Sequence, residues 1–382
     1  MSNDKIVLIG PVYPYKGGIS HYTGLLYRAL SEKYDTRMIS YKMQYPKLLF
    51  KREQKDFSND TFRVEKAEFL LNTANPFNII SVGRKIKREK PSLVIVQWWH
   101  PYFAPCYTIL AKMLKGSRIL FVCHNVFPHE RFPLDKKLTR LVLKQGDYFI
   151  LHSQTEASEL LSIKNDADYR VQVHPTYSAF QFQNLEKEEA RRQLSVPMDQ
   201  RLLLFFGYIR EYKGLKHLID AMGILEREEN KQAPQLYIVG DFDGNKEEYL
   251  NRIKACGVEK RITIVDGYVP DREVEKYFSA SDLVVLPYES ATQSGIVQIA
   301  YGFHKPVIVT RVGGLPEVVK EDKTGMIVEP GNSGQLAEAI RRFFDENKAE
   351  EYEKQIRDDE YRFSWDRMRE VIEGFLGNLN AD

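Results

Sequence analysis

The chain has 382 residues, of which 43% are hydrophobic and 28% charged. This composition is typical of a globular protein with two or three domains, and it excludes a disordered or fibrous one. The net charge of +2 hides an asymmetry, because residues 1–180 carry 27 Lys and Arg against 16 Asp and Glu, whereas residues 181–382 carry 28 against 37. A basic half is typical of a protein that meets an anionic partner, such as a membrane surface, nucleic acid or a phosphorylated substrate.

Cysteine usage and hydropathy bear on location. Cys106, Cys123 and Cys256 form no CxxC or zinc pattern, which favours a reducing compartment. The first residues, MSNDKIVLIG, are apolar only over the length of a strand, and no run of eighteen apolar residues follows. We therefore expect no signal peptide and no membrane-spanning helix, and a cytoplasmic protein that can rest peripherally on the inner face of the membrane.

Short apolar runs alternate with helical patterns along the chain. In chain order, the predicted strands are 5–10, 93–97, 118–123, 148–152, 202–207, 236–240, 262–267, 283–288, 306–310 and 325–328. Alternation of this kind is typical of βα units whose parallel sheet is buried on both faces. The fold class is therefore α/β, with one sheet in each half of the chain.

Helical spacing of apolar residues predicts helices that start near Ile19 and Leu215 and a last, amphipathic helix from Ser364 onward. We expect this last helix to pack back onto the first domain. Residues 177–189 are rich in Gln, Asn and Glu without a strong apolar period, which indicates a linker. The predicted domains are 1–183 together with 364–382, and 184–363.

In the first half, unusual residues follow the strands at their carboxyl ends, where open α/β sheets bind ligands. Gly17 and Gly18 open a helix after the first strand, and paired glycines let a backbone approach an anion or hydroxyl. A tight turn explains the pair equally simply. His124 follows residues 118–123, and we expect a functional role for it. Residues Trp98, Trp99 and His100 follow 93–97 and could stack on a sugar, or a Trp could belong to the core.

The second half repeats this arrangement. Arg210 and Lys213 follow residues 202–207, and together they could neutralise a diphosphate leaving group, or form a solvated pair. Gln293, Ser294 and Gly295 precede a helix whose backbone amides suit phosphate oxygens. The sequence holds no GxSxG, HExxH or carboxylate pair at a strand end. We therefore expect metal-independent chemistry with no metal site.

The order of motifs resembles the retaining glycosyltransferases of the GT-B fold, group 1, numbered family 4. The motifs are the glycine pair, the HN turn at His124, FGYIREYKGL, YIVGD, VDGYVPDREVEKYFSASDLVVLPY, the QSG loop with KPVIVT, VGGLPEVV and TGMIVEPGN. The resemblance implies two Rossmann-like domains that face each other across a cleft, with the C-terminal helix crossing back to the first domain. It also implies a nucleoside diphosphate sugar as co-substrate, for which we expect a UDP-sugar, and no cofactor.

The resemblance also implies roles for matching positions. The first domain would bind a glycan or lipid-linked acceptor in the synthesis of a cell-surface polysaccharide or glycoconjugate, and the second would bind the donor. The catalytic set is His124, Arg210 and Lys213. The donor-binding set is Gly17, Gly18, Tyr268, Val269, Gln293, Ser294, Gly295, Ile296 and Gln298. The acceptor-binding set, Trp98, Trp99 and His100, is predicted from the position of these residues after 93–97 and not from the resemblance.

One departure from the family pattern concerns two glutamates eight positions apart. Ala291 and Ile299 occupy those positions here, while Glu289 and Gln298 lie close by and could substitute. The family's arginine after the first glycine of its loop is also displaced, since Tyr208 stands there. A catalytically weak or silent nucleotide-sugar-binding protein is therefore the alternative function. A dehydrogenase is disfavoured by the absence of GxGxxG, and a periplasmic-type binding protein by the absence of a signal peptide.

Two basic stretches, residues 45–55 and 77–90, mix apolar side chains with Lys and Arg. Such stretches could rest on an anionic leaflet beside a lipid-linked acceptor, or be solvated faces. The basic residues match no recognised nucleic-acid module, so nucleic acid is not expected as a partner.

Overall fold

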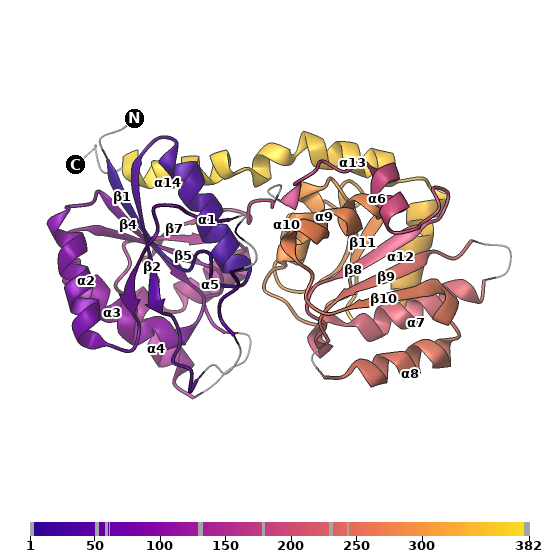
Figure 1. Ribbon diagram of the computed structural model, residues 1–382, viewed down its shortest axis with the longest axis horizontal. Coiled ribbons are helices and arrows are strands. Elements are labelled where there is room, and N and C mark those ends of the chain that lie inside the picture. The colour runs from indigo at the N-terminus through magenta and orange to yellow at the C-terminus, as the bar shows by residue number, and fades with distance from the viewer. Residues whose placement is uncertain are drawn as a thin grey trace. The chain divides into compact units, whose positions relative to one another are not determined.

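A computed structural model describes residues 4–49, 53–57, 60, 62–128, 133–177, 180–228, 232–242 and 244–377. The chain forms two compact units (Figure 1), of which the first comprises residues 1–173 and 364–382 and the second residues 174–363. The boundary thus falls at 173/174, ahead of the expected 183/184. Residues 177–189, interpreted as a linker, belong to the second unit.

The first unit is built on a seven-stranded parallel sheet, ordered β3-β2-β1-β4-β5-β6-β7. Its strands are β1 Lys5–Ile9, β2 Asp35–Met43, β3 Glu68–Asn72, β4 Leu93–Trp98, β5 Arg118–Cys123, β6 Tyr148–Leu151 and β7 Asp168–Val171. The four strands expected in this half are confirmed. Strands β2, β3 and β7 were not predicted, because their mixed polar and apolar residues give no continuous apolar run.

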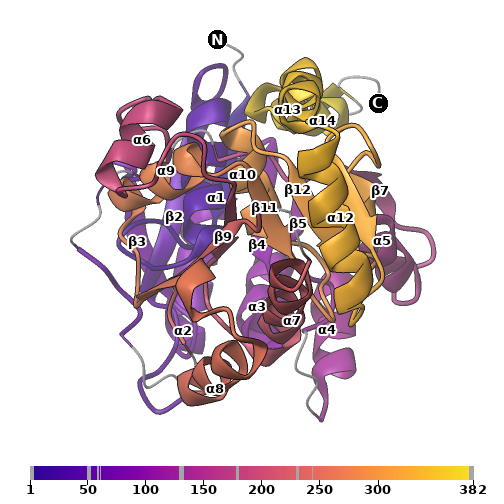
Figure 2. The same cartoon turned by 90° about the vertical axis from the view of Figure 1, so that its right-hand side faces the viewer.

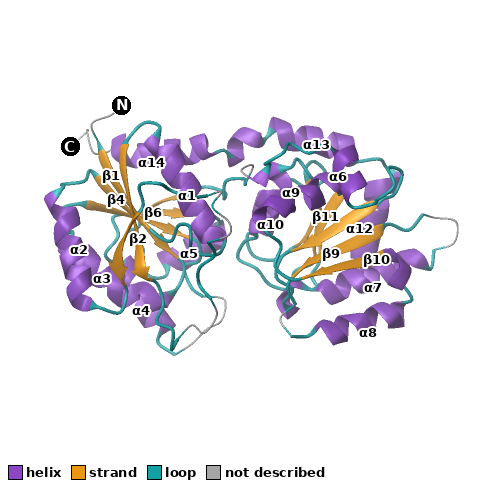
Figure 3. Ribbon diagram, viewed as in Figure 1, coloured by secondary structure: helices purple, strands orange, loops and turns teal. Residues whose placement is uncertain are grey.

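Helices cover both faces of this sheet, as the purple ribbons on either side of the orange strands show (Figure 3). They are α1 Gly18–Ser31, α2 Pro76–Arg88, α3 Ala104–Met113, α4 Asp135–Leu143, α5 Gln154–Leu161 and α14 Trp365–Gly377. Side chains of α2, α3, α4 and α5 share one core cluster with alternate residues of β1, β4 and β5. Side chains of α1 and α14 share the cluster on the opposite face with the remaining residues of these strands. Both clusters follow from the two-residue period of a strand.

The second unit has a six-stranded parallel sheet, ordered β10-β9-β8-β11-β12-β13. Its strands are β8 Leu202–Phe206, β9 Gln235–Gly240, β10 Ile262–Asp266, β11 Leu283–Leu286, β12 Val307–Thr310 and β13 Gly325–Val328, and all six were expected. Its helices are α6 Lys187–Gln193, α7 Leu215–Glu226, α8 Lys246–Cys256, α9 Asp271–Ala280, α10 Gly295–Gly302, α11 Leu315–Val318, α12 Ser333–Asp345 and α13 Ala349–Asp358.

The core of the second unit lies mainly between its sheet and helices α7, α8 and α12. In Figure 2, α7 and α12 are seen against the strands of this sheet. On the other side, Phe278 of α9 packs on Phe206 with ring centroids 5.0 Å apart, and α6 contributes Ala190 to a small cluster with Leu202 and Ala280. Both faces of this sheet are therefore buried, as expected for a parallel sheet.

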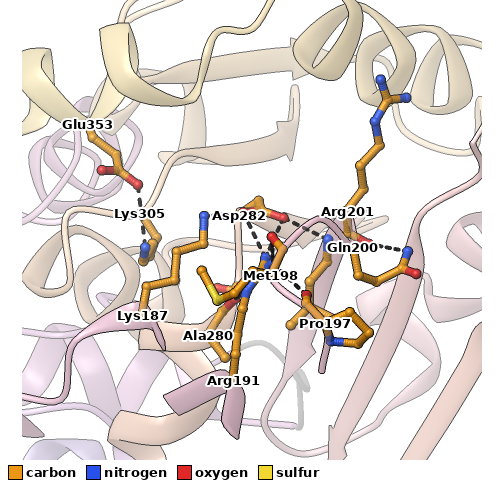
Figure 4. A network of polar contacts seen from close by, with 12 residues as sticks. Lys187, Arg191, Pro197, Met198, Gln200, Arg201, Ala280, Asp282, Lys305 and Glu353 are labelled. Atoms are coloured by element: carbon orange, nitrogen blue, oxygen red, sulfur yellow. Dashed lines mark hydrogen bonds and ion pairs between the residues drawn. The ribbon is translucent and has the colours of Figure 1, made fainter. Parts of the chain in front are cut away.

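A buried ion-pair network ties α6 to this sheet (Figure 4). The Arg191 guanidinium, 1% exposed, donates to both oxygens of Asp282 at 3.0 and 2.9 Å and also to the carbonyl oxygen of Ala280. Asp282 also accepts from Lys187 Nζ at 2.5 Å and from the backbone N–H of Leu202 at 2.7 Å. This network therefore fixes α6 against the sheet. Removing one partner would leave an uncompensated buried charge, which is strongly destabilising.

Glu275, 1% exposed on α9, explains why the expected linker belongs to the second unit. Its carboxylate accepts hydrogen bonds from the backbone N–H groups of Phe182, Gln183 and Leu185 at 2.8 to 2.9 Å. A segment without an apolar period is thus fixed by a buried carboxylate that comes about ninety residues later in the chain. None of the described helices has the length and hydrophobicity needed to cross a bilayer.

Candidate functional site

Each sheet has one point where the strand order reverses. In the first unit it lies between β1 and β4, and in the second between β8 and β11. Ligands of open α/β sheets bind outside the carboxyl ends of the strands at such a point. Most of the expected site residues lie at these two places, and each place is described within its own unit.

The glycine pair follows β1. Gly17 precedes the first residue of α1 and has a φ of 105°, a left-handed conformation that favours glycine. A Cβ built at Gly17 would meet no protein atom within 4 Å, and both Gly17 and Gly18 are exposed. Packing does not require a glycine here, whereas the backbone conformation does. The open space leaves the N-terminus of α1 accessible to an anion.

His124 follows β5 and is partly buried. Its backbone N–H donates to the carbonyl oxygen of Trp98 at 2.8 Å, and its Nε2 lies 2.7 Å from Oε1 of Gln97. Tyr22 of α1 packs edge-on against the ring at 4.7 Å. The His124 ring is therefore held by β4 and α1 at the carboxyl edge of the sheet, where a functional histidine was expected.

Trp98, Trp99 and His100 take three different positions. Trp98 is fully buried, and its Nε1 donates to the carbonyl oxygen of Val126 at 3.2 Å. It has no surface for an acceptor, so we withdraw it from the acceptor-binding set; it is the last residue of β4 and points into the core. Trp99 and His100 remain partly exposed. Trp99 Nε1 donates to the Tyr45 hydroxyl at 3.1 Å, and His100 Nδ1 accepts from the backbone N–H of Tyr102 at 3.1 Å.

Lys213 is the most perturbed cation at the second switch point. It is 9% exposed, and its Nζ lies 5.6 Å from the centre of the Tyr288 ring. Burial, and to a smaller extent the charge of Arg210, lower the pKa of Lys213 to about 8. Arg210, partly buried, accepts the backbone N–H of Lys213 at 3.0 Å through its carbonyl oxygen. A desolvated ammonium beside a second cation is a site where an anion would relieve the electrostatic cost.

Gly207 makes room for this lysine. Its φ is 102°, and a Cβ there would lie 3.2 Å from Lys213 Nζ and 3.3 Å from Cδ1 of Ile296. The turn after β8 therefore needs glycine both for its backbone conformation and for the close approach of the ammonium.

The expected phosphate-binding loop follows β11 and leads into α10. Ser294 caps this helix, because its Oγ accepts the backbone N–H of Ile296 at 3.2 Å, and the Tyr288 hydroxyl lies 3.3 Å from the same Oγ. Gly295 is exposed, and Gln293 is partly buried. The backbone N–H of Ile296, one of the amides expected to bind phosphate, thus donates to the serine hydroxyl in this structure. The four residues that lie together at the N-terminus of α10 are Gln293, Ser294, Gly295 and Ile296.

Of the two residues that could substitute for the family's glutamates, Glu289 is engaged in polar contacts and Gln298 is buried. Glu289 Oε1 lies 2.8 Å from Lys216 Nζ and 2.7 Å from His217 Nε2, and the Lys216 hydrogen bond, with that of His217, lowers the pKa of this carboxyl. Gln298 is 2% exposed, and its Oε1 is buried without a partner among the described residues. In this structure, therefore, Glu289 is committed to α7 and Gln298 to the interior.

Tyr268 and Val269 follow β10, at the edge of the sheet rather than at the switch point. Tyr268 is 51% exposed and Val269 partly buried. Across the described ranges, no group of three or more His, Cys, Asp or Glu is placed to hold a metal ion.

The structure adds Gln97, Gly207 and Tyr288 to the residues expected at the two switch points. Gln97 ends an apolar run at a buried strand position, which is the one signal that could have drawn attention to it. Nothing in the sequence shows that Tyr288, 4% exposed, contacts both Lys213 and Ser294, because these contacts join separate turns.

Comparison with known families identifies the class of protein. A model described as glycosyl transferases group 1 matches residues 186–359, and a model described as glycosyltransferase family 4 matches residues 16–176. The first match lies entirely within the second unit, and all but the last three residues of the second match lie in the first unit.

Among similar curated proteins is TuaC of Bacillus subtilis (strain 168), named as a teichuronic acid biosynthesis glycosyltransferase. It is 29% identical over 252 residues, which cover 64% of this chain and 60% of the relative. A D-inositol 3-phosphate glycosyltransferase of Corynebacterium efficiens is 29% identical over 164 residues, which cover 42% of this chain and 38% of the relative. The matches thus span about two fifths to three fifths of these relatives' own lengths.

Solved structures with the same fold cover nearly the whole chain. Anabaena HepE in complex with UDP has a TM-score of 0.75 at 17% identity, covering 98% of this chain and 100% of that one. A glycosyltransferase from Rickettsia africae has a TM-score of 0.74 at 19% identity, covering all of both chains. With two family models and one shared fold, the chain belongs to the group 1 glycosyltransferases of the GT-B fold.

Proposed function

We propose that the protein is a retaining glycosyltransferase that moves a sugar from a UDP-sugar to a hydroxyl of a glycan or lipid-linked acceptor. The observation that carries this proposal is the buried ammonium of Lys213 beside Arg210, at the carboxyl edge of the second sheet. The structures of HepE bound to UDP support the choice of nucleotide. The relative named for teichuronic acid biosynthesis supports a role in a cell-surface polysaccharide.

The proposed reaction breaks the bond between the anomeric carbon and the β-phosphate oxygen and forms a bond from that carbon to the acceptor oxygen on the same face. The acceptor hydroxyl loses its proton to the departing diphosphate, so no side chain has to act as nucleophile. Negative charge grows on the diphosphate as the bond breaks. Arg210 and Lys213 stabilise that charge more strongly in the transition state than in the donor, which lowers the barrier.

We assign the donor to the second unit and the acceptor to the first. Trp99 and His100, both partly exposed after β4, are the remaining candidates for acceptor contact. Glu289 is paired with Lys216 and His217. We therefore propose that residues other than the family's glutamate pair select the donor sugar. We further propose that no metal is required, and turnover that survives excess EDTA would support this.

The test has two stages. Thermal shifts with UDP-, GDP-, ADP- and CMP-sugars identify the nucleotide, because a ligand at 100 times its Kd stabilises by ~2.7 kcal/mol. Transfer is then measured with the double variant Arg210→Ala, Lys213→Ala. We expect a loss of ~10²-fold or more per strong contact. The matched control is Arg192→Ala, Arg357→Ala, which removes two cations whose side chains are 74% and 50% exposed.

Wild-type turnover in the double variant would refute the role of the two cations. Stabilisation by a nucleotide sugar with neither transfer nor hydrolysis would establish the alternative, a catalytically silent binding protein. Unchanged melting with every nucleotide sugar would refute both functions.

We also propose that the first unit rests on an anionic membrane surface. Leu48 and Leu49, in the first basic stretch, are 88% and 65% exposed, and Phe57 beyond it is 71% exposed. In the second stretch, Phe77 is 85% exposed, and α2 carries exposed Arg84, Lys87 and Arg88. Exposed apolar side chains beside cations are typical of surfaces that bind anionic lipids.

Vesicle co-sedimentation tests this surface. We expect wild-type protein to bind vesicles with 30% phosphatidylserine at low salt and to lose binding on Leu48→Ser, Leu49→Ser. In a separate variant, Lys87→Glu, Arg88→Glu should weaken binding at low salt relative to the wild type. The absence of binding to anionic vesicles at every salt concentration would refute the proposal.

A further inference from the structure

Gln97 is a polar side chain at a position that the fold otherwise fills with aliphatic ones. Leu93 and Ile95, on the same face of β4, belong to the core cluster shared with α1 and α14. Gln97 continues this face and is 0% exposed. Its Nε2 is buried and has no partner among the residues that the structure describes. Leucine would fill this position without the cost of burying an unsatisfied donor.

The amide does one thing that leucine cannot do. Its Oε1 lies 2.7 Å from His124 Nε2, and when it accepts a hydrogen bond there, the ring proton must be on Nε2. The backbone N–H of His124 donates to Trp98 in the same strand at 2.8 Å. Two successive residues of β4 thus hold the backbone and the ring of His124.

The backbone of the first strand leaves space for this side chain. Ile9 pairs with Val96, so Gly10 lies beside Gln97, and a Cβ at Gly10 would approach Gln97 Cγ to 2.6 Å. Real Cβ atoms do not come this close, so an alanine at position 10 would displace Gln97. Three strand ends therefore fit together around one hydrogen bond.

Tyr22 and His152, both within the described ranges, also face the His124 ring. Tyr22 of α1 lies edge-on at 4.7 Å, and His152, which follows β6, lies with its ring centre 5.6 Å away. Burial lowers the pKa of His152 to about 4, so this neighbour stays neutral at physiological pH. The hydrogen bond to the amide oxygen of Gln97 therefore favours the Nε2–H tautomer of His124.

We propose that Gln97 is a positioning residue, whose amide oxygen holds His124 as the Nε2–H tautomer and fixes the plane of its ring for sugar transfer. The inference rests on the proposed function, and it takes His124, which the family resemblance places in the catalytic set, to contact the transferred sugar. In this tautomer Nδ1 is the acceptor of the neutral ring. Gln97 itself is too deeply buried to touch a substrate.

Three variants test the inference. Gln97→Leu removes the acceptor but keeps the volume close, Gln97→Glu keeps an acceptor and adds a negative charge, and Thr139→Val is the control. Thr139 is 0% exposed on α4 of the same unit, and its hydroxyl has no partner within the described ranges, so its removal probes only the loss of a buried polar atom. The Kd for UDP and the thermal midpoint are measured in parallel to show that each variant folds.

The readouts are the ¹⁵N spectrum of the histidine rings and the pH dependence of kcat/KM. We expect Nε2–H for His124 in the wild type and a tautomer mixture in Gln97→Leu, with kcat reduced about tenfold or more and the Kd for UDP unchanged. In Gln97→Glu the carboxylate should stabilise the protonated ring, so kcat at high pH recovers and the acidic limb of the profile moves to higher pH. Thr139→Val should match the wild type.

Identical ring spectra in the wild type and Gln97→Leu, or wild-type turnover and pH profile in Gln97→Leu, would overturn the inference. If His124→Ala also retained full turnover, the role of His124 in the proposed function would fall with it. An inactive His124→Ala beside a fully active Gln97→Leu would overturn only the positioning role.

Discussion

The depressed pKa of Lys213 makes binding of a diphosphate depend on pH. The free protein holds this lysine near a pKa of about 8 because it is buried and lies close to Arg210. A bound diphosphate stabilises the ammonium form, so binding above pH 8 must draw a proton from solution. With this pKa, uptake is about half a proton per UDP at pH 8 and about nine tenths at pH 9.

The affinity should fall accordingly. Above pH 8, each further pH unit weakens UDP binding about tenfold, or about 1.4 kcal/mol, as the free lysine loses its proton. Isothermal titration calorimetry in two buffers of different ionisation enthalpy measures both the affinity and the proton uptake. Lys213→Met should bind weakly at every pH without uptake, and Lys213→Arg should lose the uptake because its guanidinium stays charged.

The lowered pKa of Lys213 also makes the free energy of unfolding of the ligand-free protein depend on pH. The folded pKa lies below the unfolded value of 10.5, so the unfolded chain binds more protons between about pH 8 and 10.5. Relative to Lys213→Met, the free energy of unfolding of the wild type should therefore rise as the pH increases through this window. Proton uptake at pH 9 that is the same in the wild type and in Lys213→Arg would refute the assignment of the coupling to Lys213.

Four further predictions each concern a single residue. Arg191→Met leaves Asp282 buried without its main partner. We therefore expect the free energy of unfolding to fall by about 3–5 kcal/mol and the thermal midpoint by at least about 6 °C. An unchanged midpoint would contradict the structural role of the pair. Glu275→Gln replaces one of the two carboxylate oxygens that accept backbone N–H groups by an NH2 donor. This should cost about 1–3 kcal/mol in urea unfolding and make residues 182–185 exchange amide hydrogens faster. Equal exchange rates would argue against the anchor. Trp98→Phe should lower the free energy of unfolding because the Val126 carbonyl oxygen loses its donor, and the Kd for UDP should stay unchanged. Gly207→Ala should weaken UDP binding because the added Cβ contacts Lys213. The reverse pattern in UDP titrations would refute both placements.

Much of the fold follows from local sequence, because fully buried parallel strands are continuous apolar runs. All six strands of the second unit and the four inner runs of the first were expected on this basis. The strands that were missed, β2, β3 and β7, carry polar residues, and β3 and β7 lie at the edges of their sheet. For such strands the neighbours in the sheet decide the conformation, and no local pattern reveals those neighbours.

The sequence by itself determined the class of protein and indicated candidate site residues, since glycines, histidines and cations stand directly after apolar runs. His124, Arg210 and Lys213 were predicted as catalytic candidates from this position and from the family resemblance. Only the tertiary structure decided which side chains are accessible and how they are paired. In the folded protein Trp98 and Lys213 are buried, and Glu289 forms polar contacts with Lys216 and His217. The amide oxygen of Gln97 lies within hydrogen-bond distance of His124. These outcomes depend on side chains from separate strands meeting at one sheet edge, and neither burial nor partner is a local property of the chain.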